Sequence, residues 1–127
     1  MGRFLPADFS QGDPNTVGGY RAAHGRPPAF EGSDGASYSV EIVCDDTSGS
    51  VQPFAAYLLF VRWRSDDPVA VGHLETDYLA FADSETAAIE LLGAMPLQTA
   101  RTHLDALIAS EVERSARRRN GEREQAR

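Results

Sequence analysis

The residues best suited to chemistry lie on one predicted strand, where a histidine and two carboxylates alternate with other residues. His73, Glu75 and Asp77 are two positions apart, so on a strand their side chains point to one face. A histidine beside carboxylates is suited to acid–base chemistry or to binding a divalent metal. A metal site needs three or four ligands, and the spacing of the other donors, His24 and Cys44, does not bring them near. We therefore predict no metal and no cofactor, and keep His73 and Glu75 as candidate ligand-binding residues.

A second candidate group lies in the glycine- and proline-rich N-terminal region. His24 stands between Arg21 and Arg26, and two arginines can bind a carboxylate or a phosphate. The alternative is that these residues only solubilise a flexible arm. An enzyme or small-ligand binder that uses His73 and Glu75 with His24 and Arg26 requires the two groups to lie within about 8 Å of each other.

The single cysteine, Cys44, is predicted to be an unreactive core residue. It ends an alternating strand on the apolar side, and Asp45 and Asp46 follow directly. Neighbouring carboxylates disfavour the thiolate, so they raise the pKa of the thiol. One cysteine cannot form an internal disulfide, and residues 1–7 do not have the apolar stretch of a secretory signal. We therefore expect a cytoplasmic protein.

Composition and charge exclude several classes of partner. The 127 residues are 42% apolar and 24% charged, which is ordinary for one globular domain, and no apolar run approaches the length of a membrane span. Residues 1–113 carry six arginines and seventeen acids, a net −11, and residues 114–127 carry six arginines and two acids, a net +4. The acidic body, and the lack of aromatic residues among the tail arginines, make nucleic acid an unlikely partner. All twelve basic residues are arginine, which suggests a GC-rich genome and a bacterial source.

The hydrophobic pattern predicts an α+β fold with three strands and two helices. Period-2 alternation indicates strands over residues 38–44, 54–64 and 69–81, the last two joined as a hairpin. Helices are expected over 84–94 and from Leu97, with a buried stripe that includes Leu91 and Val112. The predicted domain, 37–113, is a three-stranded antiparallel sheet with two helices packed on one face, a two-layer sandwich. Residues 1–36 are expected to be an irregular arm and 114–127 an arginine-rich tail that frays into solvent.

The strand over 54–64 is apolar on both faces, and this leaves a surface without cover. Two helices can cover only one face of the sheet. The other face then exposes either Tyr57, Leu59, Val61 and Trp63 or the residues that alternate with them along the strand. Such patches are uncommon on monomers. The N-terminal arm, a second copy of the chain, or a separate protein or small apolar ligand are the possible covers. We predict a non-enzymatic protein-interaction or regulatory domain that self-associates, as a homodimer, through Tyr57, Leu59 and Trp63.

Overall fold

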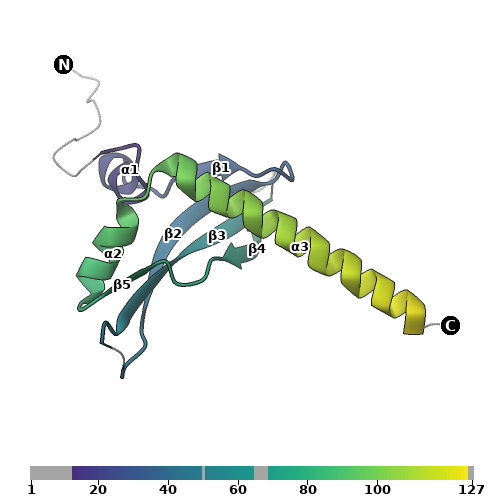
Figure 1. Ribbon diagram of the computed structural model, residues 1–127. Helices are drawn as coiled ribbons and strands as arrows, with labels where there is room; N and C mark the ends of the chain where they lie inside the picture. The colour runs from purple at the N-terminus through teal and green to yellow at the C-terminus, as the bar shows by residue number, and fades with distance from the viewer. Residues whose placement is uncertain (1–12, 50, 65–68, 126–127) are drawn as a thin grey trace, which may run out of the picture.

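The computed structural model describes residues 13–49, 51–64 and 69–125, which form one antiparallel sheet with helices on one face (Figure 1). The sheet runs β1-β2-β3-β4, and β5 also pairs with β3. The α+β class is therefore confirmed, but the prediction of three strands and two helices is too simple. The elements are α1 (Val17–His24), β1 (Ala29–Glu31), β2 (Ser37–Asp46), β3 (Phe54–Trp63), β4 (Ala70–Glu75), β5 (Ala80–Ala82), α2 (Glu85–Gly93) and α3 (Leu97–Gln125).

The central hairpin of β2 and β3 matches its prediction closely. The two strands pair over their full length, from Ser37 opposite Trp63 to Asp46 opposite Phe54. Their even-numbered side chains form the core, in which Tyr38, Leu58 and Phe60 are fully buried. Period 2 in the sequence sets this alternation, because successive side chains of a strand point to opposite faces.

The third predicted strand, 69–81, is in fact two strands separated by an irregular segment. Thr76 interrupts the ladder, because its hydroxyl oxygen accepts a hydrogen bond from the Leu58 amide at 3.0 Å. The chain resumes pairing where the Leu79 amide donates to the Ala56 carbonyl at 2.8 Å. The pairing of β3 with β4 is irregular near Gly72, since the register shifts between Arg62 and Trp63.

The expectation of an irregular N-terminal arm is wrong for residues 13–36, which contain α1 and β1. The Thr16 hydroxyl caps α1 by accepting from the Gly19 amide at 3.0 Å, and Gly25 ends the helix with φ of 68°. Glycine adopts this left-handed backbone conformation easily because it has no Cβ. The Val17 amide also donates to the Met95 carbonyl at 2.9 Å, which ties α1 to the turn between α2 and α3.

Helices α2 and α3 cover the core face of the sheet. Ser84 caps α2, since its hydroxyl accepts a hydrogen bond from the Ala87 amide at 3.1 Å. The buried residues of these helices are Ala88, Leu92, Ala100, Leu104 and Ile108. Two members of the predicted stripe, Leu91 and Val112, are instead 59% and 60% exposed.

The predicted fraying of residues 114–127 is wrong as far as the structure describes them. Helix α3 continues to Gln125 and runs past the edge of the sheet (Figure 1). Glutamate and arginine are good helix formers, which allows a solvated helix end to persist without a buried face. No helix in the described part of the chain combines the length and apolar character needed to cross a membrane.

Candidate functional site

The face of the sheet opposite the helices is an open apolar surface. The odd-numbered residues of β3 lie on it, and Tyr57, Leu59, Val61 and Trp63 are each half-buried. The Trp63 indole N–H donates to the Ser39 hydroxyl at 2.9 Å, so this ring is fixed across the neighbouring strand. We call this surface the open face.

A shallow groove follows the open face along β3 and β4. One part has a volume of about 410 Å³ and a second part of about 330 Å³ adjoins it, since both include Tyr57 and Glu75. We call the two parts together the sheet groove. It is lined by Asp45, Tyr57, Leu59, Val61, Ala70, Gly72, His73, Glu75, Thr76, Asp77 and Tyr78.

Aromatic rings gather at the β5 end of the sheet groove. Tyr57 and Tyr78 meet edge-to-face with ring centroids 5.9 Å apart, and Tyr78 meets Phe81 at 6.1 Å. The Tyr78 hydroxyl donates to the Asp45 carboxylate at 2.6 Å, which holds its ring across the sheet. That hydrogen bond, followed by burial, raises the pKa of Tyr78 above its usual value. Burial raises the pKa of Tyr57, and the charges of Glu75 and Asp45 add to this shift.

The same end of the groove is acidic. Asp45, Glu75 and Asp77 contribute carboxylates, and none of them forms an ion pair with a described residue. Arg62, the arginine of β3, does not neutralise them. Arg62 instead turns to the helix side, where it contacts Tyr38, Asp34 and Glu111. The groove therefore combines exposed rings with unpaired negative charge.

The structure separates the two groups of candidate residues that the enzyme hypothesis needs together. His73 and Glu75 lie on the open face, opposite Val61 and Leu59 of β3. His24 ends α1, which packs against α2, and its ring contacts the Tyr20 ring in a tilted arrangement with centroids 4.3 Å apart. The guanidinium of Arg26 donates to the Tyr20 hydroxyl at 3.3 Å. Helix α1 is joined to β2 through Arg21 and Glu41, and β4 lies two strands further across the sheet, so no described contact brings these groups together.

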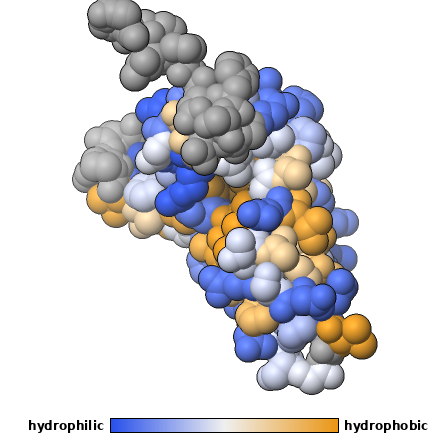
Figure 2. Space-filling model, turned by 90° about the vertical axis from the view of Figure 1, so that its left-hand side faces the viewer, coloured by the Kyte–Doolittle hydropathy of each residue, from blue (hydrophilic) through white to orange (hydrophobic). Residues whose placement is uncertain are grey.

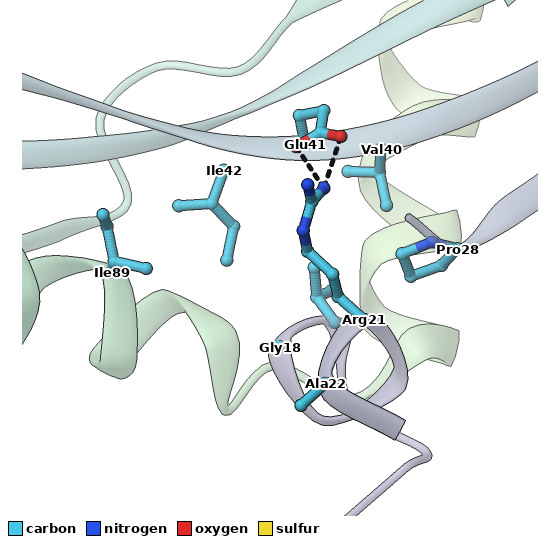
Figure 3. A pocket seen from close by; sticks show the side chains of 9 residues that line it. Gly18, Arg21, Ala22, Pro28, Val40, Glu41, Ile42 and Ile89 are labelled. Atoms are coloured by element: carbon cyan, nitrogen blue, oxygen red, sulfur yellow. Dashed lines mark hydrogen bonds and ion pairs between the residues drawn. The ribbon is translucent and has the colours of Figure 1, made fainter. Parts of the chain in front are cut away.

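A second hollow lies on the helix side, between α1, β2 and α2. Figure 2 views the molecule from the side of α1 and α2, and apolar surface is visible in a recess there. Its volume is about 520 Å³, and Val40, Ile42 and Ile89 supply apolar walls (Figure 3). Arg21 was expected to act with Arg26, but it binds both oxygens of the Glu41 carboxylate at 2.5 and 2.7 Å (Figure 3). The charged groups of Arg21 and Glu41 in this hollow are thus paired with each other.

Cys44 has the character expected of it. Its side chain is half-buried against the core, and burial raises the pKa of the thiol, with further contributions from Glu85, Asp45 and Asp46. A thiol in this setting is a poor nucleophile at neutral pH. In the described ranges, no three histidine, cysteine or acidic side chains gather closely enough to hold a metal ion.

The distal end of α3 carries a cluster of basic side chains. Arg114, Arg117 and Arg118 are exposed and, with Glu111, border a shallow hollow of about 520 Å³ on the helix surface. None of the three arginines forms an ion pair with a described side chain.

Sequence reasoning identified Tyr57, Leu59, Trp63, His73 and Glu75, but it missed three other residues of the open face. These are Asp45, Tyr78 and Phe81. Tyr78 and Phe81 fall in a segment with no regular alternation, so their side-chain directions depend on the break after β4. Comparisons of the chain with protein-family models, with curated proteins and with solved structures find no match.

Proposed function

We propose that this chain is a protein-interaction domain that self-associates through its open face. One observation supports the proposal: the apolar side chains of β3 on this face are only partly buried, and the described helices contribute to the core on the other face. Full burial of an exposed side chain of this size is worth about 1.5–3 kcal/mol, and covering these partly buried side chains contributes a fraction of that value at each position. Several such side chains in one patch provide a substantial driving force for association.

The described part of the N-terminal region does not compete for this face. Phe30 packs against the helix-side core, and Tyr20 contacts His24 on α1. Phe4 and Phe9, the other aromatic residues considered as cover, lie outside the described residues. A second copy of the chain is therefore the occupant that we propose.

The experiment is a measurement of mass in solution as a function of protein concentration. Size-exclusion chromatography with light scattering should give a dimer mass for the wild type at micromolar concentration. The double variant Leu59→Ser/Trp63→Ser should give a monomer mass. The matched control is Leu91→Ser, which makes a similar change at a 59% exposed position on the helix side and should remain dimeric.

Loss of folding is distinguished from loss of association by circular dichroism and by a milder variant. Val61→Thr keeps the side-chain shape and replaces a methyl group of the open face with a hydroxyl, which can reach water because Val61 is only partly buried. It should fold and shift the equilibrium toward monomer. A wild type that stays monomeric at all concentrations, or serine variants that unfold while Val61→Thr associates normally, would overturn the proposal.

A further inference from the structure

The charges on the open face argue against two faces stacking directly on each other. Asp45, Glu75 and Asp77 lie along the sheet groove, and His73 is the only basic residue that lines it. Two copies stacked with the β5 ends of their grooves together would bring these carboxylates close to one another while water is excluded. Like charges in such an interface cost several kcal/mol. The occupant of the groove must therefore bring positive charge.

We infer that the occupant is the basic distal end of α3 from the second copy. This inference rests on the proposed self-association and names the surface that the partner contributes. Arg114, Arg117 and Arg118 are spaced three and four residues apart, so they lie on neighbouring turns of one helix face. They are exposed and lack carboxylate partners among the described side chains.

The chemistry of the groove fits arginine in particular. A guanidinium stacks on aromatic rings and binds carboxylates through two parallel hydrogen bonds. The sheet groove offers the rings of Tyr57 and Tyr78 beside the carboxylates of Glu75 and Asp77. An arginine that enters it meets both kinds of partner at once.

The position of α3 prevents its distal end from entering the sheet groove of its own chain, but allows it to enter the sheet groove of a second copy. Helix α3 lies on the helix side of its own sheet and projects beyond the sheet edge (Figure 1). Among the side chains of α3 that the structure describes, Glu111, bonded to Arg62 at 3.2 Å, is the last with a hydrogen bond or ion pair to another element. From Glu111 to Gln125 an α-helix rises about 21 Å. The neighbouring strands of a sheet are about 4.8 Å apart, so this length is sufficient to cross the open face of a partner.

Reciprocal docking gives a closed dimer. Each copy supplies one basic helix end and one acidic groove, and a twofold axis forms the same contact twice. The charge segregation of the sequence, −11 in residues 1–113 and +4 in residues 114–127, is matched by this arrangement.

The test is a charge swap between two full-length variants. Arg117→Glu/Arg118→Glu reverses the helix end, and Glu75→Arg/Asp77→Arg reverses the groove. All four positions are exposed, so both variants should fold. Each alone should raise the dimer dissociation constant by about tenfold or more, measured by analytical ultracentrifugation. An equimolar mixture of the two should form a heterodimer of nearly wild-type affinity, because both of its contacts again join opposite charges.

The control is Arg101→Glu, which reverses an exposed arginine near the start of α3 and should leave dimerisation unchanged. If the charge variants dimerise like the wild type while Leu59→Ser/Trp63→Ser does not, the open face is the interface and the α3 inference is wrong. If both variants weaken dimerisation and the mixture fails to restore it, the two surfaces do not meet and the inference is equally wrong. A wild type that never dimerises removes the proposed function itself.

Discussion

Tyr38 and Arg62 connect four segments of the chain through one set of hydrogen bonds. The buried Tyr38 hydroxyl donates to the Asp34 carboxylate at 2.7 Å and accepts from the Arg62 Nε at 2.8 Å. Arg62 also donates to Glu111 of α3 at 3.2 Å. The loop before β2, the strands β2 and β3, and helix α3 are thus held together by groups far apart in sequence.

Removing the Tyr38 hydroxyl should destabilise the fold without changing its shape. In Tyr38→Phe, the Asp34 carboxylate and the Arg62 guanidinium lose a partner in a partly buried setting, which costs about 1–3 kcal/mol. Urea unfolding followed by circular dichroism measures this loss. Tyr20→Phe is the matched control, because the Tyr20 hydroxyl meets only an exposed arginine and should cost much less. Equal losses in the two variants would mean that the network adds no stability.

Asp34 should make part of the stability depend on pH. Partial burial opposes its ionisation, but hydrogen bonds from the Tyr38 hydroxyl and the Ala36 amide, with the charge of Arg62, outweigh it and lower the pKa of Asp34. A carboxyl group whose pKa is lower in the folded state stabilises the fold above its unfolded pKa of about 3.9. That contribution is lost as the pH falls through the folded-state value.

We therefore expect Asp34→Asn to be less stable than the wild type near pH 7 and to approach it in acid. The unfolding free energies of both proteins, measured from pH 7 down to the acid limit of the native state, test this. A difference that stays constant below the unfolded pKa of aspartate would contradict the assignment.

At the scale of elements, the periodicity of the sequence predicted a helix or a strand correctly where the residues that share the periodicity are also the ones buried in the core. Strands β2 and β3 and helix α2 were predicted nearly to their ends, because alternation or a helical stripe coincides with burial in each. Helix α1 was missed because it has a Gly18-Gly19 pair and few apolar residues. The usable signals were its caps, Thr16 before the helix and Gly25 after it.

The two glycines of α1 are required because neighbouring backbone atoms leave little room for a Cβ, and not because the helix needs a flexible backbone. A Cβ on Gly19 would lie 1.8 Å from the Asp13 carbonyl oxygen, and one on Gly18 would lie 3.0 Å from the Cα of Gly93. These contacts let α1 approach both the preceding turn and α2. No pattern in α1 alone reveals them, because the second partner is more than 70 residues away.

Glycine-to-alanine substitutions should therefore have opposite effects in two helices of this chain. Gly19→Ala should destabilise markedly, since the added methyl group collides with backbone that cannot move aside without breaking the helix cap. Gly121→Ala in α3 meets nothing within 4 Å, so the higher helix propensity of alanine should preserve or slightly increase the helix content. Thermal unfolding and far-ultraviolet circular dichroism compare the two variants. A Gly19→Ala protein as stable as the wild type would show that the contact is not as tight as described.

For the whole molecule, the sequence predicted that a face of the sheet would lack helical cover but not how that face is built. Alternation along β3 indicates which side chains share a face. The acidic and aromatic end of the groove depends on the Tyr78–Asp45 hydrogen bond, which joins positions 33 residues apart. The distal part of α3 was expected to fray because it lacks an apolar stripe. Its helical continuation is what turns scattered arginines into an ordered basic surface.

The distal end of α3 should contribute to the dimer and not to the stability of the single chain. Beyond Glu111, the described arginines make no hydrogen bond or ion pair with the rest of the fold. A chain that ends after Val112 should therefore have, at low protein concentration, an unfolding free energy within about 0.5 kcal/mol of the wild type.

At higher concentration the two proteins should diverge, because association stabilises only the chain that can associate. The thermal midpoint of the wild type should rise with protein concentration, and that of the shortened chain should stay constant. Differential scanning fluorimetry over a dilution series measures both slopes. A shortened chain that unfolds earlier even at high dilution would mean that residues 113–127 stabilise their own fold, and equal slopes would mean that they take no part in association.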